Sequence, residues 1–366
     1  MQLDSVGDLV EALRARRMVV VVDEATGNGA GCLVMAADAV DEAAVNFMVK
    51  EARGLVCVAI SEERRRRLNL PLMAKDTRRG NRYTVSVEAA QGVSTGISAA
   101  DRALTIGVLV AGDTQPDDLV QPGHIFPLVA QPDGVLRRGG FEEAGVDLAT
   151  LAGRAPAAAM VEILDDAGEV ARGPALEAFA RRHGLPLCSI GELIHHRMLV
   201  EKPIRRVRET PVETPYGRFD LIAYEDVPVG AVHLALVRGK PRADVPVHCR
   251  VQTLEILRDV LHYTHPSDPG AWNADRALAF LARQECAVMV LISDPQPRDA
   301  MLEDIDGLVR SPQTGPSVAA QRSLGIGAQI LRDTGVGKML HLSHPVPQKA
   351  VTGFGLEVVQ YLPYPG

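Results

Sequence analysis

The sequence predicts two α/β domains in one chain, and three observations support this. The chain has 366 residues, about twice the usual length of a domain, and 46% of them are hydrophobic, which is enough for two cores. Segments with helical spacing alternate with short apolar runs typical of strands. Residues 201–215 are charged and include three prolines, which favours an exposed connection. We therefore expect domains at residues 1–203 and 204–366.

Hydrophobic spacing predicts the individual elements. A helix is expected at Asp8–Arg17, leading into a buried strand at Met18–Val22. Further strands are expected in the first half at Cys32–Ala37, Leu55–Ile60, Tyr83–Val87 and Ala158–Leu164. The second half is expected to contain strands at Phe219–Tyr224, Val232–Val237 and Ala287–Ile292, a helix at Asp275–Arg283, and loops at Thr264–Asn273 and Arg310–Ser317.

Composition excludes several classes of function. The formal net charge of −7 gives no basic surface for nucleic acid, so no nucleic-acid partner is expected. No stretch of 18 apolar residues and no basic leader occurs, so we expect a cytoplasmic protein without a membrane partner. The five cysteines are scattered without a Cys-x-x-Cys spacing, which favours reduced, buried thiols.

Three blocks in the first half resemble the signature blocks of 3,4-dihydroxy-2-butanone 4-phosphate synthase: Val93–Arg102, Pro122–Leu128 and Gly134–Gly140. That family removes one carbon of ribulose 5-phosphate as formate and uses Mg²⁺ to hold the substrate oxygens. The resemblance implies an α+β synthase domain that forms a homodimer through its own face.

The sequence departs from this family at the metal site. The family's acidic loop aligns with Val22–Gly31, where its metal-binding glutamate corresponds to Gly27, its catalytic acid and aspartate to Gly29 and Gly31, and its substrate-binding arginine to Thr26. Its second metal ligand, a histidine, corresponds to Phe141. Neither glycine nor phenylalanine has a side-chain ligand atom, so the resemblance predicts that Mg²⁺ binding has been lost and that no metal ligands remain.

Other positions of the family's pocket are retained. The resemblance implies acid–base or nucleophilic roles for Glu162, His124 and Cys57. It implies substrate binding by Arg138, Asp101, Thr95 and Glu143. For His124 and Arg138, retained architecture without a function is an equally weighted alternative.

The glycine-rich segment Gly27–Gly31 also has two interpretations. Its backbone N–H groups are suited to cradle a phosphate, but no helix is evident after it, so an ordinary loop is favoured.

Blocks in the second half resemble GTP cyclohydrolase II: Thr214–Phe219, Ile222–Asp226, Leu324–Val336 and Gly353–Val359. That family binds Zn²⁺ through three cysteines, which correspond here to Glu255, Pro266 and Asp268. The resemblance therefore predicts that Zn²⁺ and GTP hydrolysis have been lost. A substitute metal site built from Glu255, His262, His265 and Asp268 is the less favoured alternative to solvent-exposed side chains.

Three functions are consistent with the sequence. The first is a riboflavin-pathway enzyme repurposed to bind or convert a small phosphorylated metabolite, sugar-phosphate or nucleotide-like, without Mg²⁺ or Zn²⁺. The second is a catalytically silent scaffold or regulatory partner of an active riboflavin enzyme. The third is a standard bifunctional enzyme, which the continuous matches beside both altered sites disfavour.

Overall fold

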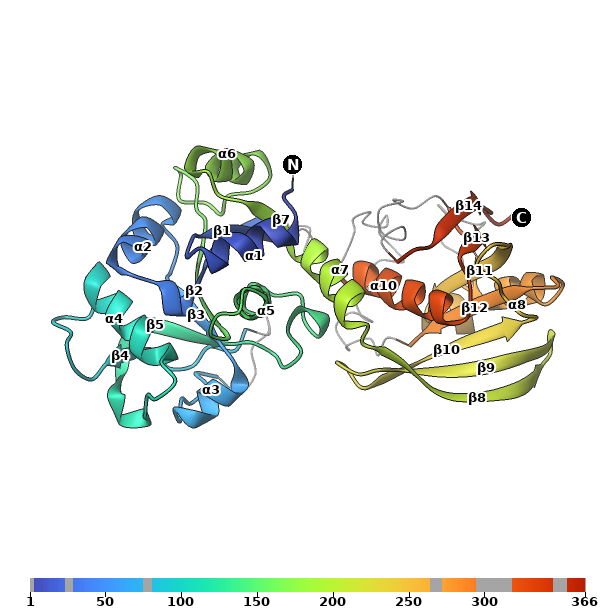
Figure 1. Ribbon diagram of the computed structural model, residues 1–366, viewed down its shortest axis with the longest axis horizontal. Helices are drawn as coiled ribbons and strands as arrows, with labels where there is room; N and C mark the ends of the chain where they lie inside the picture. The colour runs from blue at the N-terminus through green and yellow to red at the C-terminus, as the bar shows by residue number, and fades with distance from the viewer. Residues whose placement is uncertain are drawn as a thin grey trace. The chain divides into compact units, whose positions relative to one another are not determined.

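The computed structural model describes residues 3–23, 29–74, 81–263, 272–293, 318–344 and 354–365. The chain divides into two compact units, Met1–His196 and Arg197–Gly366. Each unit contains a seven-stranded sheet (Figure 1). This two-domain mixed α/β architecture is the fold class that the sequence predicts.

The first sheet has the order β4-β5-β3-β6-β2-β1-β7. Its strands are β1 (Val19–Asp23), β2 (Ala30–Ala36), β3 (Cys57–Ile60), β4 (Val87–Ala89), β5 (Leu119–Val129), β6 (Ala157–Glu162) and β7 (Leu187–Ser189). The pairs β1–β7 and β3–β5 are parallel, and the other neighbours are antiparallel. The predicted strands at β1, β2, β3 and β6 are confirmed, because their apolar runs are buried.

The described part of this unit contains six α-helices and the first half of a seventh, α7, which continues into the second unit. They are α1 (Val6–Arg14), α2 (Glu42–Phe47), α3 (Glu62–Arg67), α4 (Ala99–Val110), α5 (Phe141–Leu151), α6 (Pro174–His183) and α7 (Ile190–Glu201). The predicted first helix is confirmed. It begins after Ser5, whose hydroxyl accepts a hydrogen bond from Asp8 N in a capping box. The expected strand Tyr83–Val87 is wrong except for Val87, because Tyr83 and Thr84 make only isolated bridges.

Helices cover both faces of the first sheet. Side chains of α2, α4 and α6 pack in one core with Val20, Leu33 and Val58 on the first face. On the opposite face, α5 lies so close that a Cβ atom added to Gly145 would be 2.9 Å from Ala158 Cβ. Only a residue without a side chain allows this approach.

The second sheet has the order β14-β13-β11-β12-β10-β9-β8. Its elements are β8 (Ile204–Thr214), β9 (Gly217–Asp226), β10 (Ala231–Arg238), β11 (Pro246–Thr253), α8 (Ala274–Leu281), β12 (Ala287–Ile292), α10 (Val318–Asp333), β13 (Lys338–His341) and β14 (Glu357–Tyr361). Neighbours from β12 through β11 and β13 to β14 are parallel. Helix α8 packs with Phe219 and Met289 on one face, while Gly327 of α10 lies against Val251 on the other.

The stretch expected to be an exposed connection is instead mostly strand β8. This strand has 11 residues and pairs with β9 along its whole length. Most of its side chains are exposed because it is the last strand of its sheet in the described chain, and Pro211 is tolerated at such an edge. The predicted exposure is confirmed, but most of these residues form a paired strand of the sheet and not a connection.

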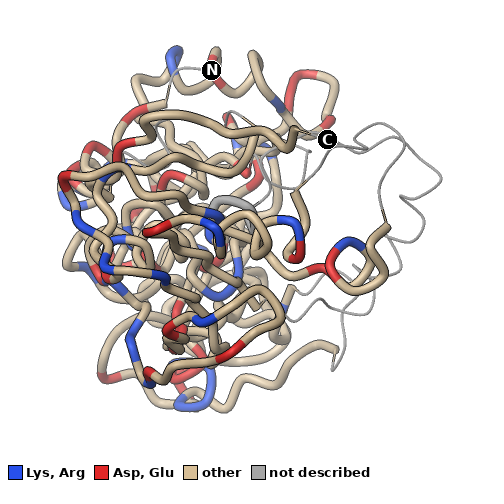
Figure 2. The backbone as a smooth tube through the Cα atoms, turned by 90° about the vertical axis from the view of Figure 1, so that its right-hand side faces the viewer, with Lys and Arg blue, Asp and Glu red and all other residues tan. Residues whose placement is uncertain are grey.

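Charges of both signs are interspersed along the chain (Figure 2). Within the described ranges, no helix is both long enough and apolar enough to span a membrane. The predicted loops at Thr264–Asn273 and Arg310–Ser317 lie largely or wholly outside the described residues.

The close approach of α5 predicts a specific sensitivity to side-chain size. Replacing Gly145 by valine should lower the thermal unfolding midpoint of the first unit by about 3–8 °C, because overpacking costs about 1–3 kcal/mol. The matched control is Gly107→Ala in α4, where an added Cβ meets no atom within 4 Å. This control should leave the midpoint unchanged or raise it, since alanine favours helix. Equal destabilisation by both variants would contradict the argument.

Candidate functional site

One face of the first sheet brings together the three predicted catalytic residues. In β6, Glu162 is two residues after Met160, which is opposite Cys57 of β3. Cys57 is in turn opposite Phe126 of β5, and His124 is two residues before Phe126. Opposite residues on neighbouring strands share a face, as do alternate residues of one strand. Glu162, Cys57 and His124 therefore all lie on the face that α5 covers.

The first turn of α5 supplies further charge to this face. Phe141 begins the helix, and Glu142 and Glu143 follow it with buried side chains. Carboxylates at a helix amino terminus are stabilised by the helix dipole. We call the group formed by Cys32, Cys57, Tyr83, Arg138, Glu142, Glu143 and Glu162 the α5 cluster.

Arg138 is neutralised by its own neighbours in the sequence. Its Nη2 atom lies 2.8 Å from Glu143 Oε2 and also forms an ion pair with Glu142. The Glu143 side chain is fully buried, so the pair is shielded from water. One guanidinium between two carboxylates favours a structural role for Arg138 and Glu143 over direct binding of an anion.

Burial controls protonation in the α5 cluster. It raises the pKa of Glu143 to about 7, with the charge of Glu142 adding to the effect and Arg138 opposing it. Burial likewise raises the pKa of Cys57 to about 12, although a hydrogen bond from Tyr83 acts in the opposite direction. Cys57 is therefore a neutral thiol at neutral pH, which disfavours the nucleophilic role considered for it.

A histidine–carboxylate pair lies beside the loop of residues 90–98, which joins β4 to α4. His124 Nδ1 is 2.7 Å from Glu88 Oε2, and the Thr105 hydroxyl donates to Glu88 Oε1 at 3.0 Å. A Cβ atom on Gly96 would lie 2.0 Å from Glu88 Oε2, so the loop passes over this pair only with glycine there. A buried carboxylate that orients an exposed imidazole is an arrangement suited to proton transfer.

Thr95 belongs to this loop, whereas Asp101 lies in the first turn of α4. Asp101 accepts hydrogen bonds from the Ser94 hydroxyl at 2.8 Å and from Gly96 N at 3.0 Å. The bond from Ser94 lowers the pKa of Asp101. Asp101 thus holds the loop in place, whereas Thr95 is exposed on it.

Comparisons with known proteins agree with this architecture. Residues 7–196 match the family model of 3,4-dihydroxy-2-butanone 4-phosphate synthase, and residues 205–363 match that of GTP cyclohydrolase II. The chain belongs to the two-domain riboflavin-biosynthesis family that joins these modules.

Several relatives share nearly the whole length. A 3,4-dihydroxy-2-butanone 4-phosphate synthase of Pseudomonas aeruginosa is 43% identical, with 99% of this chain and 100% of that protein aligned. The riboflavin biosynthesis protein RibBA of Cytophaga hutchinsonii is 38% identical, with 99% of this chain and 92% of that protein aligned. The crystal structure of a two-domain synthase, RibBX, from A. baumannii is 40% identical with a TM-score of 0.83, covering 98% of this chain and 99% of that one.

Two positions that the sequence aligns with the family's Mg²⁺ site, Gly31 and Phe141, are among the described residues. Phe141 offers no side-chain ligand atom, and a side chain at Gly31 would meet Leu176 at 2.4 Å. Gly27 and Thr26 lie outside the described residues, as does most of the glycine-rich segment. Across the described part of the chain, no three His, Cys, Asp or Glu side chains are grouped so as to hold a metal ion.

In the cyclohydrolase-like unit, the two described members of the suggested substitute metal site have other partners. Glu255 Oε2 lies 3.2 Å from Arg258, and His262 Nε2 lies 3.4 Å from Asp275. His265, Pro266 and Asp268 fall outside the described residues.

Sequence reasoning missed a buried polar group at the carboxyl ends of β11 and β13. Arg250 donates to Leu342 O at 2.7 Å and to Gln252 Oε1 at 2.8 Å. Burial lowers the pKa of His341 to about 4, and Arg250 adds to the shift, so this imidazole is neutral at neutral pH. No spacing in the sequence indicates the group, because its members come from separate strands.

Glu143 should make the stability of the first unit depend on pH. Between its ordinary pKa and about 7 the folded protein binds a proton that the unfolded chain does not, so stability falls as pH rises through this window. Glu143→Gln should raise the free energy of unfolding at pH 8 by about 1–3 kcal/mol relative to the parent and change it little at pH 5. Urea unfolding at the two pH values tests this, with the exposed Glu63→Gln as control. An equal effect of Glu143→Gln at both values would contradict it.

Proposed function

We propose that this chain is a divergent member of its family whose synthase pocket binds and converts a small phosphorylated metabolite by proton transfer, without the family's Mg²⁺ and Zn²⁺ chemistry. The observation that carries this proposal is the 2.7 Å His124–Glu88 pair on the sheet face shared with Glu162. The substrate class is a sugar phosphate or a nucleotide-like phosphate. The protein acts in the cytoplasm as a homodimer.

One unused donor supports binding of an anion. The buried Arg102 Nε has no hydrogen-bond partner among the residues that the structure describes. A buried donor without an acceptor costs about 1–3 kcal/mol, which a ligand oxygen recovers. Arg102 directly follows Asp101 at the start of α4, and the charge of Glu88 acts on it. A phosphate on Arg102 would thus lie near the His124–Glu88 pair.

The departures at the metal site support a reaction that does not need Mg²⁺. Phe141, Gly29 and Gly31 provide no carboxylate or imidazole for a hard cation. In the proposed step, the His124 imidazole takes a proton from a carbon beside a carbonyl, and Glu88 stabilises the imidazolium that forms. The same proton returns to the neighbouring carbon, with Glu162 moving a second proton between the substrate oxygens. The step is an isomerisation, so no atom is gained or lost.

The second candidate, a catalytically silent partner of an active riboflavin enzyme, is favoured by one observation. Glu142 and Glu143 neutralise Arg138, which weakens that arginine as an anchor for phosphate. In this alternative, the fold and the dimer are retained while no small molecule is converted.

Ligand binding should be independent of Mg²⁺. Isothermal titration of the EDTA-treated protein with ribulose 5-phosphate should give a dissociation constant in the micromolar to millimolar range, unchanged when MgCl₂ replaces EDTA. No formate should be released in either buffer, and the protein should carry no stoichiometric zinc by elemental analysis. Mg²⁺-dependent release of formate would show instead that the standard synthase reaction is intact.

Proton transfer should be visible by isotope exchange. In D₂O with EDTA, the parent protein should incorporate deuterium beside the carbonyl of ribulose 5-phosphate, as followed by NMR. His124→Gln and Glu162→Gln should each slow exchange about 10²-fold or more, the usual contribution of a general acid or base.

The control for this experiment is Glu169→Gln, an exposed carboxylate in the turn that follows β6. Its exchange rate should equal that of the parent. No exchange by a folded parent protein that binds the probe would refute the catalytic proposal and favour the silent partner.

A further inference from the structure

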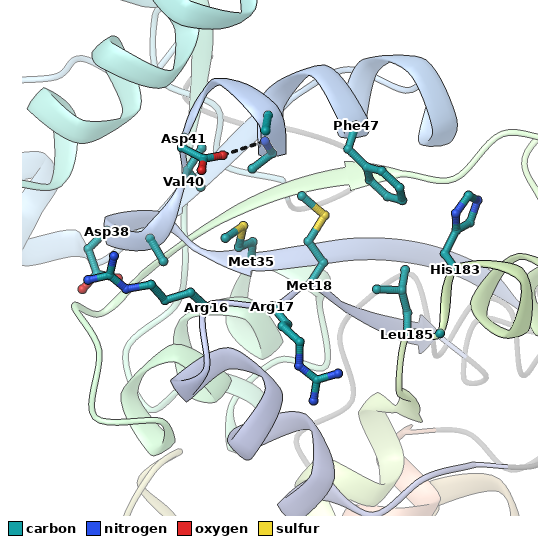
Figure 3. A pocket seen from close by; sticks show the side chains of 14 residues that line it. Arg16, Arg17, Met18, Met35, Asp38, Val40, Asp41, Phe47, His183 and Leu185 are labelled. Atoms are coloured by element: carbon teal, nitrogen blue, oxygen red, sulfur yellow. Dashed lines mark hydrogen bonds between the residues drawn. The ribbon is translucent and has the colours of Figure 1, made fainter.

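A groove on the first unit lies away from the α5 cluster. It is lined by residues of the turn after α1, the start of α2 and the end of α6, and its volume is about 620 Å³. Met35, at its floor, packs in the core on the sheet face opposite Cys32, because residues alternate along β2. We call this the α1–α2 groove (Figure 3).

The floor of the groove is apolar and aromatic. Met18 and Met35 lie between Arg16 on one side and Phe47 and His183 on the other (Figure 3). The rings of Phe47 and His183 meet edge to face, with centroids 5.0 Å apart. Thioethers and aromatic edges make favourable contacts with a flat aromatic ring. His183 Nε2 is buried and lies 3.6 Å from Glu51 Oε2.

Two arginines, Arg16 and Arg17, lie at the groove. Arg16 and Arg17 are exposed, and no ion pair or side-chain hydrogen bond involves either of them in the described part of the chain. Arg16 has φ 59° directly after the cap of α1, a position where glycine is usual. An arginine there accepts about 1 kcal/mol of backbone strain.

The acidic residues of the groove are already engaged. Asp38 Oδ1 accepts from Arg154 Nε at 3.1 Å, and Asp41 caps α2 by accepting from Ala44 N at 2.8 Å. Asp38 is balanced by Arg154, and Asp41 keeps its charge, so Arg16 and Arg17 leave the groove with a formal charge of +1.

We propose that the α1–α2 groove is a second ligand site, which binds a phosphorylated aromatic heterocycle of the nucleoside or flavin monophosphate class. The ring lies on Met18, Met35 and Phe47, and the phosphate binds the Arg16 and Arg17 guanidinium groups. The volume is within the range of small-molecule sites. The groove is independent of the proposed catalytic face, so this inference does not rest on the proposed function.

Direct binding to the full chain tests this site. Riboflavin 5′-phosphate, followed by its fluorescence, and adenosine 5′-phosphate, followed by calorimetry, distinguish the two classes of ring. At least one should bind in the micromolar range, and riboflavin without phosphate, or inorganic phosphate alone, should bind at least about tenfold more weakly.

Matched variants assign the binding to the groove. Arg16→Gly keeps the turn, because glycine favours its φ, yet should raise the dissociation constant about tenfold or more, as should Arg17→Ala. The control Arg14→Ala removes an exposed arginine that is paired with Glu11 outside the groove, and should bind like the parent. His124→Gln should not alter this binding, which separates the result from the catalytic proposal. Absence of binding by both phosphates, or equal binding by Arg16→Gly and the parent, would overturn the proposal.

Discussion

The close approach of α5 to the first sheet is the constraint on which the site depends. Gly145 lets the helix backbone lie against Ala158, and this fixes the first turn of α5 over the face that carries Cys57 and Glu162. Two carboxylates are thereby buried at the same place. They require a cation, which Arg138 supplies from the segment directly before the helix.

The result is two polar groups with different character. Arg138, Glu142 and Glu143 form ion pairs with one another, and these pairs determine how the first turn of α5 packs on the sheet. The pair of His124 and Glu88 combines a buried carboxylate with an imidazole that is 42% exposed and therefore able to meet a ligand. The first group stabilises the fold around the second, and the second has the groups needed for acid–base chemistry.

The sequence predicts those parts of the molecule that depend on local patterns. Strands β1, β2 and β12 are continuous apolar runs. A strand that is buried on both faces has this pattern, so these strands can be predicted from the sequence. Strand β8 was not predicted, since an exposed edge has the composition of a linker. The role of Glu88 was not predicted either. Its carboxylate contacts His124 only because β4 pairs with β5 in the folded sheet, and no local pattern in the sequence shows this pairing. The high pKa of Cys57 depends on burial by segments distant in the sequence.

The exposed edge at β8 has a consequence for association of the chain. A long outer strand offers a row of open backbone groups to any extended peptide, which invites uncontrolled stacking of sheets. Here the register shifts between Arg206 and Arg208, Pro211 removes one donor, and charged side chains line the strand. These features oppose the addition of a strand from another molecule at that edge.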